Sequence, residues 1–260
     1  MAPRVIVLRA PGTNCDRETA YAWELAGAKA EVFHLNRVLE KPDLLNDYQI
    51  LCIPGGFSYG DDICAGRIFG TQMRHHLYDA LQSFKAAGKL MLGICNGFQV
   101  LMKSGVLLPD TADQPHATLT LNESGKYEDR WVNLQTDGSK SVFLKGLDRM
   151  YLPVAHAEGK FVTRDADTLS KLGTSGQLCL RYTSEGSTGP AKNDAIAYPI
   201  NPNGAQWNVA GLCDETGRVM GLMPHPERHI DPTHHPRWTR KCAEKGDGLA
   251  LFENGVAYFK

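Results

Sequence analysis

The sequence has no long apolar run, no excess of charge of either sign and no signal-peptide pattern, and each absence excludes a class of protein. No apolar stretch approaches the ~18 residues that a membrane-spanning helix needs. The formal net charge of −1 at pH 7 provides no electrostatic basis for binding nucleic acid or an anionic membrane. The apolar run from Val5 to Ala10 is too short and wrongly flanked for a signal peptide. We therefore expect a cytoplasmic protein with neither a membrane nor a nucleic-acid partner.

Disulfide, phosphate-loop and zinc patterns are also missing. The seven cysteines are odd in number and show no Cys-x-x-Cys spacing, which predicts reduced thiols. No Gly-x-x-x-x-Gly-Lys-Ser/Thr phosphate loop occurs. His225 and His229 lie four residues apart, a spacing that can bind zinc on a helix, but Pro226 disfavours a helix there and no His-Glu-x-x-His order is present. The sequence therefore predicts no metal site and no nucleotide site on this chain.

The first hundred residues alternate between strand-like and helix-like segments. The predicted strands are Val5–Arg9, Ala30–His34, Ile50–Ile53 and Leu90–Ile94, and the predicted helices are Asp16–Leu25 and Gln72–Ala87. The apolar residues that share one face of the longer helix are Met73, Leu77, Leu81 and Phe84. Repeated βα units with apolar strands predict a mostly parallel sheet with helices on both faces.

After Pro109 the pattern changes to short extended segments separated by turns. These segments are Ala117–Leu121, Trp131–Leu134, Tyr151–Ala155, Leu178–Tyr182, Val209–Leu212 and Val219–Met223. They predict an antiparallel extension of the sheet, and Gly248–Phe259 predicts a closing helix. A chain of 260 residues can bury one full core. We therefore expect one α/β domain over residues 1–260.

A cysteine flanked by glycines, the Gly-Ile-Cys-Asn-Gly motif at 93–97, stands between a predicted strand and amphipathic sequence over Phe98–Ser104. The pattern is that of the Gly-x-Ser-x-Gly nucleophile elbow, with sulfur in place of oxygen. The glycines permit a tight turn and let a substrate approach the backbone. A helix N-terminus favours the thiolate. Although a buried structural cysteine is the commoner fate of this residue, we predict that Cys95 is a catalytic nucleophile. Cys15 lies at a predicted helix start with no base motif nearby, so we expect a structural role for it.

A thiolate nucleophile needs a base, and the base needs a group that orients it. The run Met-Pro-His-Pro-Glu-Arg at 223–228 offers both. Because residues two apart in an extended segment point to the same side, Glu227 can hold the imidazole of His225. The sequence thus predicts a Cys95, His225 and Glu227 triad. The Pro-Val-Ala-His-Ala-Glu-Gly run at 153–159 repeats the His-x-Glu spacing, so His156 and Glu158 remain a competing pair.

A third element is the Pro-Gly-Gly-Phe-Ser-Tyr-Gly-Asp-Asp run at 54–62, directly after a strand-like segment. Paired glycines at the carboxyl end of a strand expose backbone N–H groups. We expect Gly55 and Gly56 to lie beside the nucleophile, with the N–H of Asn96 completing an oxyanion hole. A plain turn is the alternative, since Pro-Gly-Gly is common turn chemistry.

Together these motifs resemble the class I (triad) glutamine amidotransferases. The runs at 54–61, 93–99, 153–159 and 201–204 are most similar to the phosphoribosylformylglycinamidine synthase branch of that family, in its separate glutaminase subunit. The resemblance spans about Val5 to Arg228 and resumes at Gly246–Phe252. It implies a flavodoxin-like fold, hydrolysis of L-glutamine through a thioester on Cys95, and a glutamine site that includes Gln99 and the Gly55–Gly56 loop.

The resemblance also implies partners. Ammonia released from glutamine would pass to the synthetase subunit of the same enzyme, which in many bacteria is joined by a small third subunit. That synthetase converts formylglycinamide ribonucleotide to the formylglycinamidine product. ATP and magnesium are expected on the synthetase, and no cofactor is expected on this chain. Two alternatives stay open: an amidotransferase that serves another synthetase, and a non-catalytic binding or chaperone-like protein with the same elbow.

The segment between Arg228 and the closing helix is longer than the family pattern implies. It is basic, interrupted by prolines and carries one large aromatic side chain, Trp238. Since it begins one residue after the catalytic motif, we expect it near the mouth of the active site. A surface insertion without a role is one interpretation. The other is that Trp238 and Arg240 dock the synthetase partner, because tryptophan and arginine are favoured interface anchors.

Overall fold

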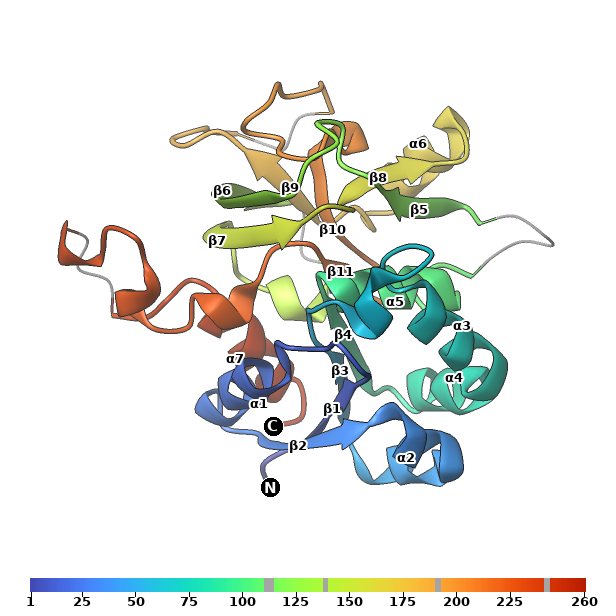
Figure 1. The fold of residues 1–260 in the computed structure, drawn as a ribbon. Helices are drawn as coiled ribbons and strands as arrows, with labels where there is room; N and C mark the ends of the chain where they lie inside the picture. Colours follow the sequence, from blue (N-terminus) through green and yellow to red (C-terminus); the bar gives the residue numbers. More distant parts are fainter. Residues whose placement is uncertain (110–114, 138–139, 190–192, 241–243) are drawn as a thin grey trace.

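A sheet of nine strands lies at the centre of the fold (Figure 1). The computed structural model describes residues 1–109, 115–137, 140–189, 193–240 and 244–260. The strand order is β2-β1-β3-β4-β11-β10-β9-β6-β7. Non-consecutive neighbours in this order show that the chain crosses over repeatedly. The sequence-based expectation of an α/β fold with a mostly parallel sheet and an antiparallel extension is confirmed. The expectation of one domain over 1–260 stays a prediction.

Parallel strands build the half of the sheet that contains the N-terminus. They are β1 (Arg4–Arg9), β2 (Lys29–His34), β3 (Ile50–Ile53), β4 (Leu90–Ile94) and β11 (Val219–Leu222). All residues of β3, β4 and β11 are buried, because helices cover both faces and both faces therefore need apolar side chains.

Helices lie on the two faces of this parallel half, as Figure 1 shows. On one face are α1 (Asp16–Leu25) and α7 (Leu249–Ala257), and on the other are α3 (Arg67–His76), α4 (Tyr78–Ala86) and α5 (Asn96–Ser104). The short α2 (Leu35–Glu40) follows β2 and was not predicted. Trp23 of α1 meets Phe252 of α7 edge-to-face at 5.0 Å. That contact fixes the last helix against the first.

The antiparallel half consists of β6 (Glu128–Thr136), β7 (Arg149–His156), β9 (Leu180–Thr183) and β10 (Val209–Cys213). Burial alternates along β7, as expected for strands with one packed face. Two parts of the predicted extension were wrong. The strand at 219–222 pairs in parallel with β4, at the centre of the sheet. The strand β5 (Ala117–Thr120) pairs with an unpredicted β8 (Lys160–Thr163) in a separate two-stranded sheet.

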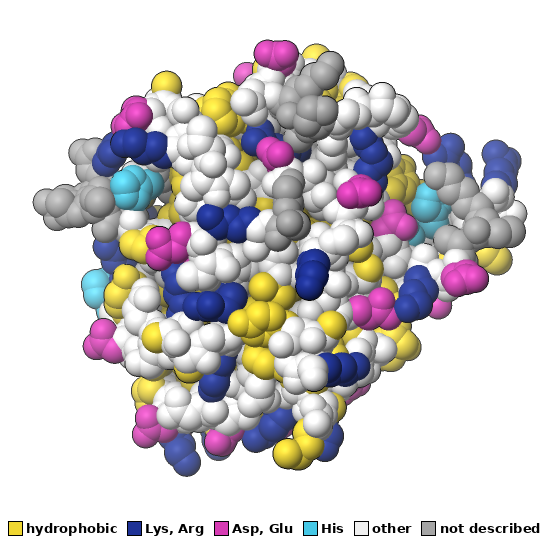
Figure 2. Space-filling model, turned by 180° about the vertical axis from the view of Figure 1, so that it is seen from behind, with side chains coloured by type: hydrophobic (Ala, Val, Ile, Leu, Met, Phe, Trp, Pro, Cys, Tyr) yellow, Lys and Arg dark blue, Asp and Glu magenta, His cyan; other side chains and the backbone are white. Residues whose placement is uncertain are grey.

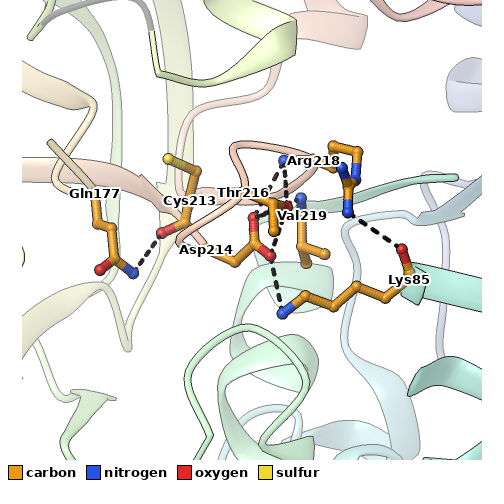
Figure 3. Close-up of polar contacts among 7 residues, drawn as sticks. All are labelled: Lys85, Gln177, Cys213, Asp214, Thr216, Arg218 and Val219. Atoms are coloured by element: carbon orange, nitrogen blue, oxygen red, sulfur yellow. Dashed lines mark hydrogen bonds and ion pairs between the residues drawn. The ribbon is translucent and has the colours of Figure 1, made fainter. Parts of the chain in front are cut away.

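A polar cluster at the β10–β11 turn holds β11 in this central place (Figure 3). The carboxylate of Asp214 accepts hydrogen bonds from the backbone amides of Arg218 and Val219 and from the hydroxyl of Thr216. The ammonium of Lys85 on α4 lies 2.8 Å from the same carboxylate, and both side chains are largely buried. The turn is thereby tied to a helix that lies far away in the sequence.

The single long helix predicted over 72–87 was also wrong. The chain forms α3 and α4 with a break at Leu77, whose φ of −122° is not helical. Periodicity alone missed the break because all four predicted apolar positions, including Leu77, are buried. The helix α6 (Ala166–Thr174) was not predicted either, and its N-cap Asp165 accepts a hydrogen bond from the amide of Thr168.

Several 3₁₀ turns complete the described structure. They are η1 (Pro42–Asp47), η2 (Ser58–Asp61), η3 (Val142–Leu144), η4 (Gln206–Asn208), η5 (Pro226–Arg228), η6 (Pro232–His234) and η7 (Trp238–Arg240). No helix in the described ranges is both long and apolar enough to cross a membrane. Seen from behind, basic and acidic side chains are interspersed over the surface with small apolar groups between them (Figure 2), in keeping with the small net charge.

Candidate active site

Cys95 occupies the sharp turn between β4 and α5. Its backbone has φ 49° and ψ −104°, a left-handed conformation that is costly for a residue with a side chain. Such strain costs about 1–3 kcal/mol and clusters at functional sites. The side chain is 4% exposed, and its sulfur lies 3.6 Å from the carbonyl oxygen of Ala155 on β7. The predicted elbow is therefore present as strand, strained cysteine and helix.

The glycines around Cys95 permit the tight turn that was predicted, but they face protein atoms and not a substrate. A Cβ at Gly97 would overlap the backbone carbonyl of Ile53 on β3, and a Cβ at Gly93 would lie 2.5 Å from the carbonyl oxygen of Gly97. Both positions are surrounded by protein atoms. These glycines let α5 pack tightly against β3 and β4, whereas the sequence-based interpretation had them admitting a substrate to the backbone.

His225 and Glu227 follow the end of β11 and form a buried pair. The Nδ1 atom of His225 lies 2.6 Å from Oε1 of Glu227, and both residues are 2% exposed. The expected extended segment is only half correct, because His225 is extended but Pro226 begins the turn η5. That turn brings the carboxylate back to the ring. Burial lowers the pKa of His225, but the Glu227 carboxylate and the Cys95 thiol outweigh it and hold the pKa well above its usual value.

The competing pair, His156 and Glu158, does not form. His156 Nδ1 lies 3.1 Å from Oδ1 of Asn122, while Glu158 accepts a hydrogen bond from the amide of Ala65 at 3.1 Å. Burial and then the charge of His225 lower the pKa of His156 to about 3. A histidine in this state stays neutral, and no carboxylate orients it. The geometry therefore favours the later His-x-Glu pair as base and orienting group.

The space beside Cys95 is a small cavity of about 190 Å³. Its lining consists of Asn14, Cys15, Gly56, Phe57, Cys95, Tyr127, Ala155, His225 and Arg228. Gly56 is thus at the cavity as predicted, and Gly55 lies directly behind the imidazole, where a Cβ would be 2.7 Å from Cε1 of His225. Asn96 is the first residue of α5, so its backbone N–H has no partner within the helix.

The side chains of Asn96 and Gln99 hold loops in place. Asn96 donates to Asp61 at 3.1 Å and to Gln99 at 3.0 Å, and it accepts from the amide of Ser58. Gln99 donates to the backbone carbonyl of Glu158 at 2.6 Å. Since Gln99 is not among the residues that line the cavity, its amide supports the wall behind the site. Its predicted contact with glutamine remains a prediction.

Sequence reasoning named three residues of the cavity wall, Gly56, Cys95 and His225, and missed the other six: Asn14, Cys15, Phe57, Tyr127, Ala155 and Arg228. Phe57 and Tyr127 stack at 6.4 Å across the cavity rim, from two loops distant in sequence. No local pattern marks Tyr127. Arg228 was visible as the residue after the His-Pro-Glu motif, and Cys15 was set aside because its base lies far away in the sequence.

Cys15, His225 and Glu227 place possible metal-ligating atoms within 4.8 Å of one another, and within the described ranges this is the one group of its kind. The 2.6 Å between Nδ1 and Oε1 is shorter than the roughly 3.3 Å between two ligands of one tetrahedral zinc. The His225–Glu227 pair is therefore a hydrogen bond and not a pair of zinc ligands.

Comparison with known proteins decides the family. The sequence pattern of the CobB/CobQ-like glutamine amidotransferase domain matches residues 2–259. The chain belongs to the glutamine amidotransferase family. Phosphoribosylformylglycinamidine synthase subunit PurQ of Dehalococcoides mccartyi is 44% identical over 98% of this chain and 97% of that protein. The PurQ subunit of Methanococcus maripaludis strain C7 is 39% identical over 100% of this chain and 98% of that protein.

One solved structure agrees with this assignment in both sequence and fold. A structure described as PurLQS from Thermotoga maritima matches with a TM-score of 0.75 and 30% identity, over the whole of both chains. A putative GMP synthase subunit from Thermoplasma acidophilum matches with a TM-score of 0.55 over 99% of this chain and 94% of that chain, but at 13% identity it shows the fold alone. The predicted family of this enzyme is thus confirmed.

Proposed function

We propose that this chain is the glutaminase subunit of phosphoribosylformylglycinamidine synthase, and that Cys95, His225 and Glu227 perform its chemistry. The observation that supports this most is the meeting of three distant segments at one cavity: the strained elbow, the Gly55–Gly56 loop and the turn η5. Relatives named PurQ are similar over nearly their whole length, so the enzyme's glutaminase is the activity that the site serves.

In the first step, Nε2 of His225 takes the proton of the Cys95 thiol. This nitrogen is buried and has no hydrogen-bond partner among the described residues, and the raised pKa of the ring favours transfer of the thiol proton to it. The thiolate attacks the δ-carbon of glutamine, and the backbone N–H groups of Gly56 and Asn96 stabilise the oxyanion. The imidazolium then returns its proton to the departing nitrogen. Ammonia leaves, and a γ-glutamyl thioester remains on Cys95.

In the second step, water attacks the thioester carbonyl. His225 removes a proton from the water and passes it to the Cys95 sulfur as the carbon–sulfur bond breaks. Glutamate is released and the thiol is restored. Glu227 keeps Nδ1 of His225 protonated throughout, so that Nε2 faces Cys95.

The ammonia serves a cytoplasmic synthetase partner that aminates formylglycinamide ribonucleotide. We expect the synthetase to hold ATP and magnesium. A small third subunit completes the assembly, and the description of the Thermotoga maritima structure as PurLQS supports this subunit composition. Transfer of ammonia from glutamine to the ribonucleotide needs close contact between the two subunits, since ammonia that escapes is protonated in water.

A glutaminase assay with and without the synthetase subunit tests the proposal. We expect release of glutamate from L-glutamine by the purified pair, with formation of the amidine product when ATP, magnesium and the ribonucleotide are added. Absence of glutamate release by the complete complex would overturn it. Release without amidine formation would point to a different synthetase.

A further inference from the structure

A second buried thiol lies against the imidazole of His225. Cys15 stands at the start of α1, is 1% exposed and lines the cavity beside Cys95. Its sulfur lies within 4.8 Å of the ligating atoms of His225 and Glu227. A Cβ on Gly55 would lie 3.2 Å from this sulfur and 2.7 Å from Cε1 of His225. Cys15 and the imidazole therefore share one tightly filled space behind the ring.

Arg228 holds this thiol in place. Its guanidinium donates from Nη2 to the sulfur of Cys15 at 3.2 Å, and from Nε to the carboxylate of Glu18 at 2.9 Å. Glu18 lies one turn further along α1. Arg228 comes one residue after Glu227, so the same contacts tie the turn η5 to α1. The turn η5 therefore carries both the Glu227 carboxylate, which orients the ring, and the Arg228 guanidinium, which holds Cys15.

The hydrogen bonds of Cys15 show what its thiol donates to and what it accepts from. The S–H of Cys15 donates to Oδ1 of Asn14 at 3.3 Å, which leaves the sulfur lone pairs to accept from Arg228. Burial raises the pKa of Cys15, although His225 and Arg228 oppose this effect. The thiol is therefore neutral and serves as a contact surface; it does not compete with Cys95 as a nucleophile.

We propose that Cys15, held by Arg228 and Asn14, is a positioning residue that keeps the His225 ring aimed at Cys95. The inference rests on the proposed function, because it assigns Cys15 a role in the same proton transfer. Among the described residues, only Glu227 forms a hydrogen bond with the ring, at Nδ1, and a ring held at one atom can still tilt. Cys15 and Gly55 close the space into which the ring would tilt.

The test compares Cys15→Ala and Cys15→Ser with the unaltered chain in complex with its synthetase. For Cys15→Ala we expect kcat to fall roughly 10- to 100-fold, because misplacement of a catalytic group by about 1 Å has effects of this size. KM for glutamine should stay within about twofold, since the bound substrate keeps its contacts. Cys15→Ser should retain more turnover, because its hydroxyl can still bond to Asn14 and Arg228.

The pH profile of kcat/KM provides a readout that a merely structural role would not move. The titratable groups that act on His225 are Glu227, Cys95, Cys15, His156 and Tyr127. Contact with Cys15 raises the pKa of His225. In Cys15→Ala the limb of the profile that reports His225 should therefore move to lower pH.

Cys179→Ala is the matched control, because it removes another fully buried thiol, directly before β9. It should lower thermal stability as Cys15→Ala does, with kcat and the pH profile unchanged. If Cys15→Ala does not fold, Glu18→Gln loosens Arg228 from the surface and should lower kcat in the same direction. A folded Cys15→Ala with normal kcat and pH profile would overturn the inference while leaving the proposed glutaminase intact.

Discussion

The two sides of the active site are assembled in different ways. Cys95 stands between β4 and α5, which are consecutive in the chain, and the glycines that permit the turn lie within two residues of it. His225 follows β11, which reaches the centre of the sheet only by pairing with β4 and β10. The nucleophile thus depends on local structure, and the base depends on long-range pairing. Damage to distant residues should therefore affect the base side first.

The largest effect is expected on the nucleophile side. Cys95→Ser should keep the fold and abolish thioester formation, because the hydroxyl is a far weaker nucleophile at this site. A glutamine-mimicking diazoketone should label Cys95 alone, as followed by peptide mass spectrometry. Label on Cys15 or Cys64 would show that the elbow does not carry the nucleophile. Loss of label in Cys95→Ser is the control for specificity.

On the base side, His225→Ala should reduce kcat by about 100- to 10,000-fold, the usual contribution of a general base. Glu227→Gln should cost less, because orientation is degraded while the base remains. Steady-state glutaminase kinetics with the synthetase present measure both. His156→Ala is the matched comparison, since that histidine is also buried and lies on β7. A larger loss in His156→Ala than in His225→Ala would mean that the earlier His-x-Glu run holds the base.

The placement of β11 can be tested through its tie to α4. Lys85→Met leaves the buried carboxylate of Asp214 without its cation, and breaking a buried pair costs about 3–5 kcal/mol. Urea unfolding should report this loss. Lys171→Met, which breaks the exposed pair with Asp167, should cost far less, because water already screens that pair. Equal costs in the two variants would show that the β10–β11 turn does not depend on Lys85.

The segment that follows Arg228 continues the chain from the base motif, and its predicted contact with the synthetase can be tested. The aromatic residues Trp131, Tyr151, His229 and His235 pack together at its base. Trp238 is 53% exposed, and η6 and η7 lie on an extension at the left of Figure 1. None of the described residues of the segment lines the cavity of Cys95, but Ile230 and His234 share a neighbouring hollow with Glu227 and Arg228. The expected position near the mouth of the active site stays a prediction.

The proposed docking by Trp238 and Arg240 stays a prediction. Trp238→Ala should weaken binding of the synthetase by about 2 kcal/mol, with the basal glutaminase of the free chain unchanged. Titration calorimetry measures the affinity. Tyr258→Ala removes another exposed aromatic, next to α7, and should have no effect. Equal affinities for Trp238→Ala and the unaltered chain would leave the segment as a surface loop.

The smallest effect concerns Asp61, which supports the elbow side. Burial and then the charge of Glu158 raise its pKa from 3.8 to about 6. The folded state thus holds the proton more tightly than the unfolded chain, and the associated stability is lost as pH rises from 3.8 to about 6. Asp61→Asn keeps an acceptor for Asn96 but lacks this dependence. Melting temperatures of the two proteins should diverge across that range, and parallel curves would contradict the shift.

Much of the site could be predicted because the residues proposed to perform its chemistry lie in short sequence motifs. The glycine–cysteine turn, the His-Pro-Glu run and the paired glycines each lie within a few residues of one another. Strand predictions for β1, β3 and β4 were close because buried parallel strands are uninterrupted apolar runs. The sequence by itself determined the family, the elbow and the residues proposed for the triad.

Tertiary structure alone decided which distant segments meet. Apolar periodicity is the same whether a strand lies at an edge or at the centre, so the position of β11 followed only from its pairing and from the Lys85–Asp214 contact. The contact of Cys15 with His225 joins the first helix to the last strand. No local sequence pattern predicts such a contact, because the contact arises from packing between elements that come together only when the chain folds.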